Sequence, residues 1–284
     1  MVKIAGIQFS GHAKRERNLE KITRYVTEAA QHGAQVVCLP ELSTSIYFCC
    51  EANYSHFDYA EPVPGPSTEE VAALAKRVGA TVIFPLFERV AEGQYYNTAA
   101  VVSSRGELIG KYRKNSIPLS VAKDGRVTAN EKMYFQPGNL GFPVFRIPEG
   151  LTIGMLICYD RHYPEGARII GLGGADVLFV PTNTWRAPMK DVWELELRAH
   201  AVANVYYVCG VNKVGVDEGG SPNHFFGSSM VVDPLGKVIA RAGDQADEIM
   251  YAELDLAHLA DVKRTWPLFR DRRPDAYGRI CAPA

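Results

Sequence analysis

The chain has 284 residues, 47% of them hydrophobic and 22% charged, so it can bury a sizeable core and is not a disordered sequence. Its 31 basic and 32 acidic residues leave a formal charge of −1, which excludes a strong overall field for nucleic acid or an anionic membrane. No apolar run approaches the roughly 18 residues that span a bilayer, and the N-terminal MVKIAGIQFSG lacks the long apolar core of a signal peptide. We therefore expect a soluble, cytoplasmic protein.

Strand and helix patterns alternate along the chain. In chain order they predict a strand at 2–9, a helix at 18–31, a strand at 34–40, a helix at 67–79, strands at 81–90, 95–103 and 106–114, an irregular stretch at 115–142, strands at 143–147 and 151–158, a helix at 164–172, a strand at 175–183, a helix at 191–204, a strand at 205–212 and a hairpin at 227–242. Ser67 is the expected N-cap of its helix, with Glu70 completing a capping box. No repeat or linker interrupts this order, so we expect one α/β domain over residues 1–284, with two sheets covered by helices.

The spacing of the cysteines does not indicate a disulfide framework or a zinc site. They are Cys38, Cys49, Cys50, Cys158, Cys209 and Cys281, and none makes a C-x-x-C pair. The length of the chain and the missing export signal argue against structural disulfides. No two Cys or His residues fall at the spacing of a zinc finger or ribbon, so we expect no metal. Most of these thiols are expected to be small core residues, with one or two at most taking part in chemistry.

Three reactive side chains come at the ends of predicted strands. Glu41 follows AQVVCLP, Lys114 ends GELIGKYRK, and Cys158 ends LTIGMLIC. Because ligands of α/β sheets bind beyond the carboxyl ends of strands, these three side chains are expected to converge on one pocket. A thiol nucleophile needs a base and a group that stabilises an oxyanion, which a carboxylate and an ammonium supply. Taken singly, they also fit a loop carboxylate, a surface lysine and one more buried thiol.

Sequence motifs at these positions resemble a known family. LPEL at 39–42, KYRKNSIP at 111–118 and CYDRHYPEGAR at 158–168 are similar to the three signatures of the nitrilase superfamily of carbon–nitrogen hydrolases. EKMYFQPGN at 131–139, FGSSMVVDPLG at 226–236 and FRDRRPDAY at 269–277 fit its carbamoyl-amine branches. The resemblance covers nearly the whole chain and implies a four-layer α-β-β-α sandwich of two sheets flanked by helices.

The resemblance also implies a Glu-Lys-Cys triad. Glu41 is then the general base, Lys114 the electrostatic stabiliser and Cys158 the nucleophile, while Glu131 positions the lysine and the substrate. A backbone N–H near Tyr159 is expected to help Lys114 stabilise the oxyanion, and no cofactor is required. One departure is visible, because relatives often carry a histidine where this chain has Ser116.

The substrate that we expect depends on the role of Arg161. In relatives that hydrolyse N-carbamoyl amino acids, an arginine at this point of the motif binds the substrate carboxylate, which suits its bidentate geometry. We therefore expect cleavage of an N-carbamoyl amino acid of the N-carbamoyl-β-alanine type to ammonia, CO2 and free amine, as in β-ureidopropionase. The alternatives are N-carbamoylputrescine, whose far end is a cation, or an aliphatic amide or nitrile. In another interpretation Arg161 pairs with Asp160 or Glu165 and never contacts substrate.

Four further residues are candidates for substrate binding. His162 is interpreted as a pocket-wall residue, not as the base of a Cys-His dyad, because its spacing from Cys158 does not guarantee contact. Asn183 and Trp185 follow a predicted strand, and Tyr47 belongs to an aromatic loop, SIYFCCEANYSHF, that fits either a lid or a core segment.

The basic C-terminal tail is the last feature of note. Residues 263–279 contain six bases, but two interspersed acids argue against a track for phosphates. The family resemblance implies that the tail, from about residue 256, packs across a dimer interface and that the chain forms a homodimer or a larger homo-oligomer.

Overall fold

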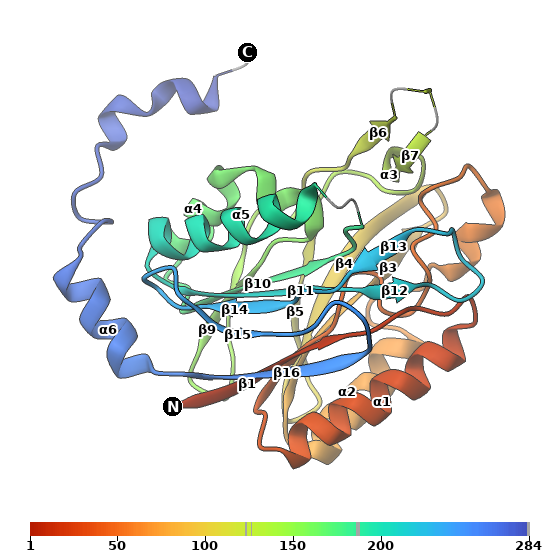
Figure 1. Cartoon of the computed structure of the whole chain (residues 1–284), viewed down its shortest axis with the longest axis horizontal. Coiled ribbons are helices and arrows are strands. Elements are labelled where there is room, and N and C mark those ends of the chain that lie inside the picture. Colours follow the sequence, from red (N-terminus) through yellow and green to blue (C-terminus); the bar gives the residue numbers. More distant parts are fainter. Residues whose placement is uncertain (123, 126, 186–187, 283–284) are drawn as a thin grey trace.

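Two six-stranded sheets packed face to face form the centre of the molecule (Figure 1). The protein's computed structural model describes residues 1–122, 124–125, 127–185 and 188–282. In spatial order the first sheet consists of β16 (Glu248–Leu254), β1 (Val2–Gln8), β2 (Val36–Cys38), β3 (Thr81–Ala91), β4 (Gln94–Val102) and β5 (Leu108–Arg113). The second consists of β15 (Val238–Arg241), β14 (Met230–Val232), β11 (Tyr207–Asn212), β10 (Val177–Thr182), β9 (Thr152–Met155) and β8 (Val144–Arg146).

The two sheets share one pattern of strand directions. Three strands run parallel in each, β1, β2 and β3 in the first and β9, β10 and β11 in the second. Antiparallel strands flank these on both sides. The carboxyl ends of parallel strands meet at one edge, and this is where the sequence places its reactive side chains.

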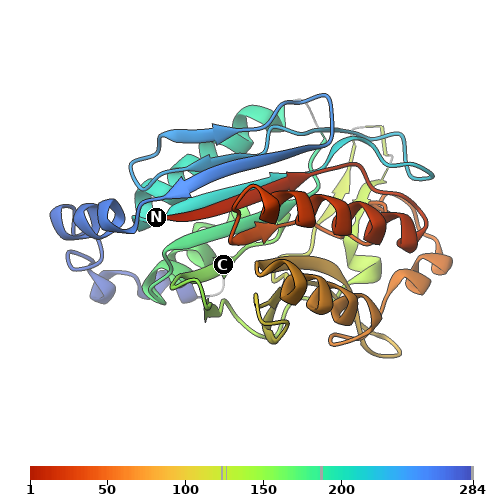
Figure 2. The ribbon, with the colours of Figure 1, turned by 90° about the horizontal axis from the view of Figure 1, so that it is seen from below.

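Helices cover the outer face of each sheet. The described helices are α1 (Arg15–Gln31), α2 (Pro66–Val78), α3 (Glu131–Tyr134), α4 (Pro164–Leu172), α5 (Met189–Asn204) and α6 (Leu256–Thr265). The pair α1 and α2 lies side by side against the first sheet (Figure 2), and α4 and α5 lie on the opposite side of the molecule, against the second (Figure 1). This confirms the predicted α-β-β-α sandwich.

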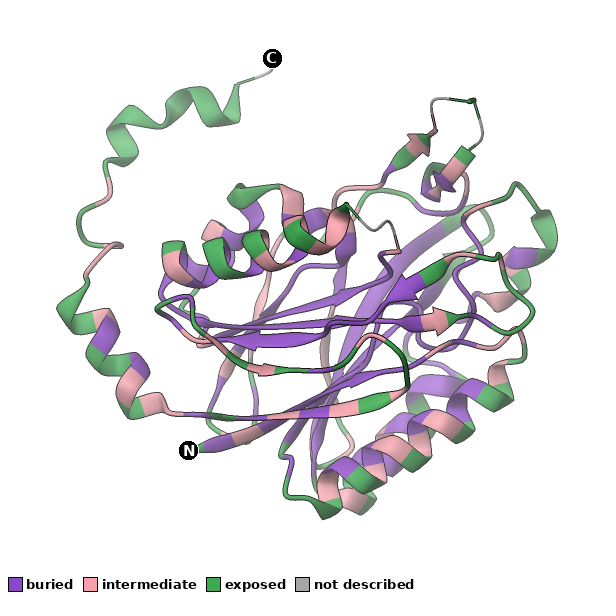
Figure 3. Ribbon diagram, viewed as in Figure 1, coloured by how far each residue is buried: buried purple, intermediate pink, exposed green. Residues whose placement is uncertain are grey.

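The alternation of apolar residues along the strands explains the layers. Successive strand residues point to opposite faces, so Ile4 joins the core between the two sheets while Ala5 joins the core under α1 and α2. Cys38 and Leu39 divide in the same way. Because both faces are covered, these strands are apolar throughout, as is usual for parallel sheets. Figure 3 shows this as continuous burial of the central strands.

Two expectations about local structure were wrong. Helix α2 begins at Pro66 rather than after Ser67, with Gly65 as its N-cap, because the hydroxyl of Thr68 accepts a hydrogen bond from the Gly65 N–H at 2.6 Å. The stretch 115–142 is not irregular throughout: it contains a hairpin of β6 (Leu119–Val121) and β7 (Val127–Asn130), followed by α3. A second small pair, β12 (Val214–Val216) and β13 (His224–Phe226), was also not predicted.

Beyond β16 the chain leaves the two sheets. The carboxylate of Asp255 caps α6 by accepting hydrogen bonds from the N–H groups of Ala257 and His258. After α6 come two short 3-10 helices, Pro274–Ala276 and Gly278–Cys281, and this segment extends outward with most of its residues exposed (Figures 1 and 3). Among the described residues, no helix is both long enough and apolar enough to cross a membrane.

Candidate active site

The three predicted reactive residues come from both sheets. Glu41 lies three residues beyond β2, and Lys114 directly follows β5, both in the first sheet. Cys158 follows β9 of the second sheet and opens a 3-10 helix, η2 (Cys158–His162). The site is therefore assembled where the two sheets meet.

A buried ion cluster lies behind the thiol. The ammonium of Lys114 donates to Oε1 of Glu41 at 2.9 Å and to Oε2 of Glu131 at 2.6 Å, and all three side chains are shielded from solvent. Asn97 donates to the same oxygen of Glu41 at 2.7 Å. The other oxygen of Glu41 has no hydrogen-bond partner among the described residues. Glu41 is thus held in place by one oxygen, and its second oxygen is available to take a proton.

The charged groups in this cluster shift one another's pKa values. Burial opposes the charged form of Lys114, but the carboxylates of Glu131 and Glu41 outweigh it and raise the pKa of the ammonium well above its usual value. Burial raises the pKa of Glu131 to about 7, although the adjacent Lys114 ammonium works in the opposite direction. Lys114 is therefore a permanent cation at neutral pH.

The Cys158 thiol is neutral at rest. Burial, together with the negative charge of Glu41, raises its pKa to about 12, against the lowering effect of Lys114 and Arg161. Its backbone φ is +49°, in the left-handed region that residues other than glycine rarely occupy. Such strain costs on the order of 1–3 kcal/mol and persists only where the surroundings enforce it.

Asp160 enforces this backbone turn. Its Oδ2 accepts hydrogen bonds from the Tyr112 hydroxyl at 2.6 Å and from the Ile157 N–H at 3.2 Å. Its Oδ1 accepts from the backbone N–H of Ser116 at 2.7 Å. Asp160 therefore ties the turn at the nucleophile to the segment that follows Lys114, at the position where relatives often have a histidine.

Arg161 and His162 are both bound to a residue that the sequence analysis missed. The Nε of Arg161 lies 3.0 Å from Oε2 of Glu196, and the Nδ1 of His162 lies 2.6 Å from its Oε1. One terminal nitrogen of Arg161 also donates to the carbonyl of Cys158 at 2.9 Å. Glu196 belongs to α5 and shares a face with Trp193 and His200, which are three residues before and four after it. The sequence did contain a signal for Glu196, because a carboxylate stood there on the face of the helix that carries buried residues.

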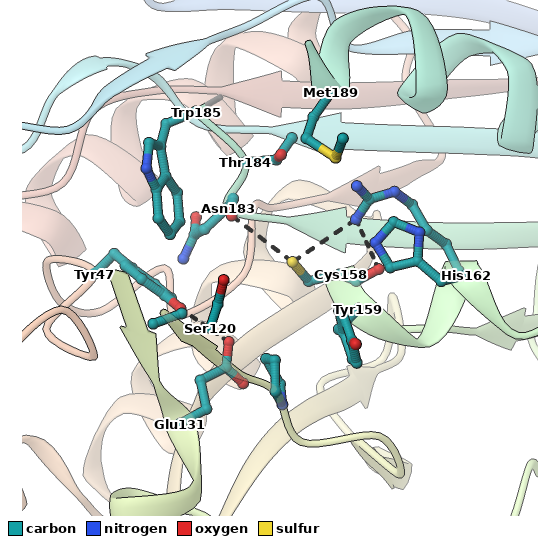
Figure 4. Close-up of a pocket in the computed structure, with 13 residues that line it drawn as sticks. Tyr47, Ser120, Glu131, Cys158, Tyr159, His162, Asn183, Thr184, Trp185 and Met189 are labelled. Carbon is teal, nitrogen blue, oxygen red and sulfur yellow. Dashed lines mark hydrogen bonds between the residues drawn. The ribbon is translucent and has the colours of Figure 1, made fainter. Parts of the chain in front are cut away.

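A cavity of about 130 Å³ opens in front of Cys158 (Figure 4). Eight of the predicted site residues line it: Tyr47, Glu131, Cys158, Tyr159, Arg161, His162, Asn183 and Trp185. Glu41 and Lys114 are fully buried and do not line the cavity. Pro118, Ser120 and Ala129, from the β6–β7 hairpin and the segment before it, with Thr184 and Met189 near α5, complete the lining and were not predicted.

The aromatic loop is a fixed wall of this cavity. Residues 41–49 are buried, and the Tyr47 hydroxyl donates to Oε1 of Glu131 at 3.0 Å. The Tyr47 ring packs against Trp185, with centroids 5.1 Å apart. Its backbone N–H donates to Asp217 at 2.7 Å. Of the two roles predicted for the loop at 45–57, a core segment fits residues 45–49, whereas residues 51–55 are exposed.

The described residues include no group of three or more His, Cys, Asp or Glu side chains placed to bind a metal ion. The chemistry that the site offers is that of its own side chains: a thiol, a carboxylate with one free oxygen and a buried ammonium. These are the groups needed for acyl transfer through a thioester.

Comparisons with known proteins identify the family of this chain. The family model for carbon-nitrogen hydrolase matches residues 3–264. The chain is 35% identical to an N-carbamoylputrescine amidase of Solanum lycopersicum, over 98% of this chain and 94% of the relative. It is 34% identical to a citrullinase of Francisella tularensis subsp. tularensis, over 98% of both chains. Identity to a beta-ureidopropionase of Arabidopsis thaliana is 30%, over 93% of this chain and 66% of the relative.

The fold also matches a solved structure. The crystal structure of a carbon-nitrogen hydrolase from Helicobacter pylori superimposes with a TM-score of 0.91 at 34% identity, covering 99% of this chain and 98% of that one. Sequence and fold both match this family over nearly the whole length of the chain. The chain therefore belongs to the nitrilase superfamily of carbon–nitrogen hydrolases and is an enzyme that hydrolyses non-peptide carbon–nitrogen bonds.

Proposed function

We propose that this enzyme hydrolyses the terminal ureido group of a small N-carbamoyl amine, with Cys158 as nucleophile, Glu41 as general base and Lys114 as electrostatic stabiliser. Because the pKa of the Cys158 thiol is raised to about 12, a base must take its proton during attack. The unpartnered oxygen of Glu41 supports this role.

The proposed reaction has two halves. The sulfur attacks the ureido carbon, its proton passes to Glu41, and the oxyanion that forms is stabilised by the Lys114 ammonium and the Tyr159 N–H. Ammonia leaves with the proton from Glu41, and the carbamoyl group stays on sulfur. Glu41 then deprotonates water, which displaces the thiolate and gives a carbamate that decomposes to the amine and CO2, and Glu41 returns the proton to the sulfur of Cys158. Glu131 holds Lys114 in place throughout.

The contacts of Arg161 determine which substrate we propose. Arg161 is the one arginine or lysine among the described residues that line the cavity, and its Nε and one of its terminal nitrogens are already engaged by Glu196 and by the Cys158 carbonyl. This supports an amine-bearing substrate of the N-carbamoylputrescine type, the alternative of the sequence analysis, over N-carbamoyl-β-alanine. The higher identity to the N-carbamoylputrescine amidase than to the beta-ureidopropionase also supports it.

A ureido amino acid is the second candidate, because the relative named citrullinase is 34% identical over nearly the full length. The test is a panel of N-carbamoylputrescine, L-citrulline and N-carbamoyl-β-alanine, with ammonia release measured for each. We expect the highest kcat/KM for N-carbamoylputrescine. Fastest turnover of N-carbamoyl-β-alanine, lost in Arg161→Lys, would show that Arg161 does bind a carboxylate and would overturn the proposal.

A further inference from the structure

Asn183 has an amide group with nothing bound to it. The residue is 2% exposed, yet neither Oδ1 nor Nδ2 has a hydrogen-bond partner among the residues that the structure describes. Asn212, its near neighbour on the adjacent strand β11, is fully engaged: Oδ1 accepts from the Thr184 N–H, and Nδ2 donates to the carbonyls of Thr184 and Gly227. A buried amide without partners is costly, and in a native structure it calls for a ligand or a function.

The position of this amide puts it beside the reacting atoms. The Cys158 thiol points at the backbone carbonyl of Asn183, 3.7 Å away. In Figure 4 the Asn183 side chain lies between Trp185 and the Cys158 sulfur and reaches into the cavity. A substrate carbonyl carbon attacked by that sulfur is therefore next to the amide.

The backbone that carries the amide is also held in place. Asn183 directly follows β10, a central strand of the second sheet, and the next residue, Thr184, is fixed through both its backbone N–H and its carbonyl by Asn212. The amide donor and acceptor of Asn183 are thus presented to the substrate from a well-positioned backbone.

We infer that Asn183 is the residue by which the site selects a ureido group over a simple carboxamide. This inference rests on the proposed function. A ureido substrate carries an N–H on the far side of its carbonyl, where a carboxamide carries a CH₂. That N–H donates to Oδ1 of Asn183, whereas a CH₂ at the same place leaves the oxygen unpaired in a dry pocket. A site built to bind a polar hydrogen discriminates strongly against the analogue that lacks it.

The test compares two substrates that differ only at this group: N-carbamoylputrescine and 6-aminohexanamide, in which a methylene replaces the ureido N–H. We expect the wild-type kcat/KM to favour the ureido compound by about tenfold or more. In Asn183→Leu, which keeps the volume but not the polarity, the ratio falls toward one, mainly through loss of ureido turnover. Met189→Leu, a conservative change of another lining residue, leaves the ratio unchanged.

A second variant keeps the inference testable if Asn183→Leu does not fold. Asn183→Asp retains the acceptor and is expected to retain the preference for the ureido compound, even if both rates drop. Equal losses on the two substrates in Asn183→Leu would mean that Asn183 only supports the structure, and equal wild-type rates would also overturn the inference. Turnover of 6-aminohexanamide with none of N-carbamoylputrescine would overturn the proposed function itself.

Discussion

Lys213 and Asp217 form an ion pair that is shielded from solvent, with 2.9 Å between Nζ and Oδ2. Asp217 also accepts hydrogen bonds from the backbone N–H groups of Tyr47 at 2.7 Å and Gly11 at 2.5 Å, and Lys213 donates to the Ser45 carbonyl at 2.9 Å. The pair therefore anchors the loop that brings the Tyr47 hydroxyl to Glu131. Neither residue lines the cavity, yet both determine where one of its walls lies.

We expect Asp217→Asn to destabilise the protein by about 3–5 kcal/mol, because it leaves the ammonium of Lys213 buried without its counter-charge. Urea unfolding at neutral pH measures this change. Glu20→Gln is the control, since Glu20 pairs with Arg17 on the open surface and such pairs add little stability. Equal stability of Asp217→Asn and wild type would show that the pair does not hold the loop.

Cys158→Ser is expected to lower kcat by at least about 10³-fold, because a buried serine hydroxyl is a much weaker nucleophile than the thiol in this site. The variant should unfold at the same denaturant concentration as wild type within error, since the two side chains have nearly the same shape. Cys281→Ser, which alters an exposed thiol, should retain full activity. Substantial turnover by Cys158→Ser would exclude Cys158 as the nucleophile.

Glu131 should make the stability of the protein depend on pH. Its pKa is about 7 in the folded protein and 4.5 as an ordinary glutamate. Between these values the folded state holds a proton that the unfolded chain has lost, so the contribution of Glu131 to stability is present below pH 4.5 and is lost as the pH rises through 7. The loss is at most about 3 kcal/mol. In Glu131→Gln, urea titrations at several pH values should show a smaller fall over this window, and an unchanged fall would assign it to other groups.

Glu196 should act on catalysis through Arg161 and His162. Removing its carboxylate in Glu196→Ala leaves the buried guanidinium of Arg161 unpaired and frees the His162 ring, so we expect kcat/KM to fall by about tenfold or more. Glu194→Ala is the matched control on the same helix, because Glu194 pairs with Arg198 and Arg241 at the surface. If both variants lose activity equally, the effect comes from α5 as a whole and not from the contact with Arg161.

The exposed C-terminal segment should hold subunits together. Trp266 and Ile280 are 41% and 61% exposed, so this segment offers large apolar side chains for burial at an interface. We propose that this segment packs against a second copy of the chain, as the family resemblance implies. Sedimentation velocity should then show a homodimer or larger assembly, and deletion from residue 266 onward should reduce its size. A monomeric full-length chain would contradict this.

The parts of the site that the sequence could predict are those whose position follows from a strand end. Glu41, Lys114 and Cys158 each come within three residues of a strand, so sheet topology predicts that they lie near one another. Glu196 was not found, because its role depends on how α5 is rotated against η2, and the sequence of an amphipathic helix does not give that angle. Arg161 was recognised as a substrate-binding candidate, and the other interpretation paired it with Asp160 or Glu165 of the same motif, but its carboxylate partner is Glu196 on α5.

Local turn geometry was the other source of error. The start of α2 was assigned from a Ser-x-x-Glu pattern, but Pro66 favours the first helical position and moves the N-cap to Gly65. The β6–β7 hairpin escaped notice because its strands are only three and four residues long and polar residues interrupt them. It supplies one wall of the cavity, so the pocket could not be outlined from sequence.

Because β1 pairs with β16, the first sheet is complete only after the C-terminal part of the chain has been synthesised. β1 is synthesised first, but its antiparallel partner, which joins Val2 to Leu254 and Gln8 to Glu248, comes from the other end of the chain. Until β16 has been synthesised, one edge of β1 exposes a row of unpaired N–H and C=O groups, and such an edge is a template for association with other chains. A nascent chain or fragment that ends before residue 248 therefore carries all the catalytic side chains and an open sheet edge, so it is expected to need a chaperone before it can be an enzyme.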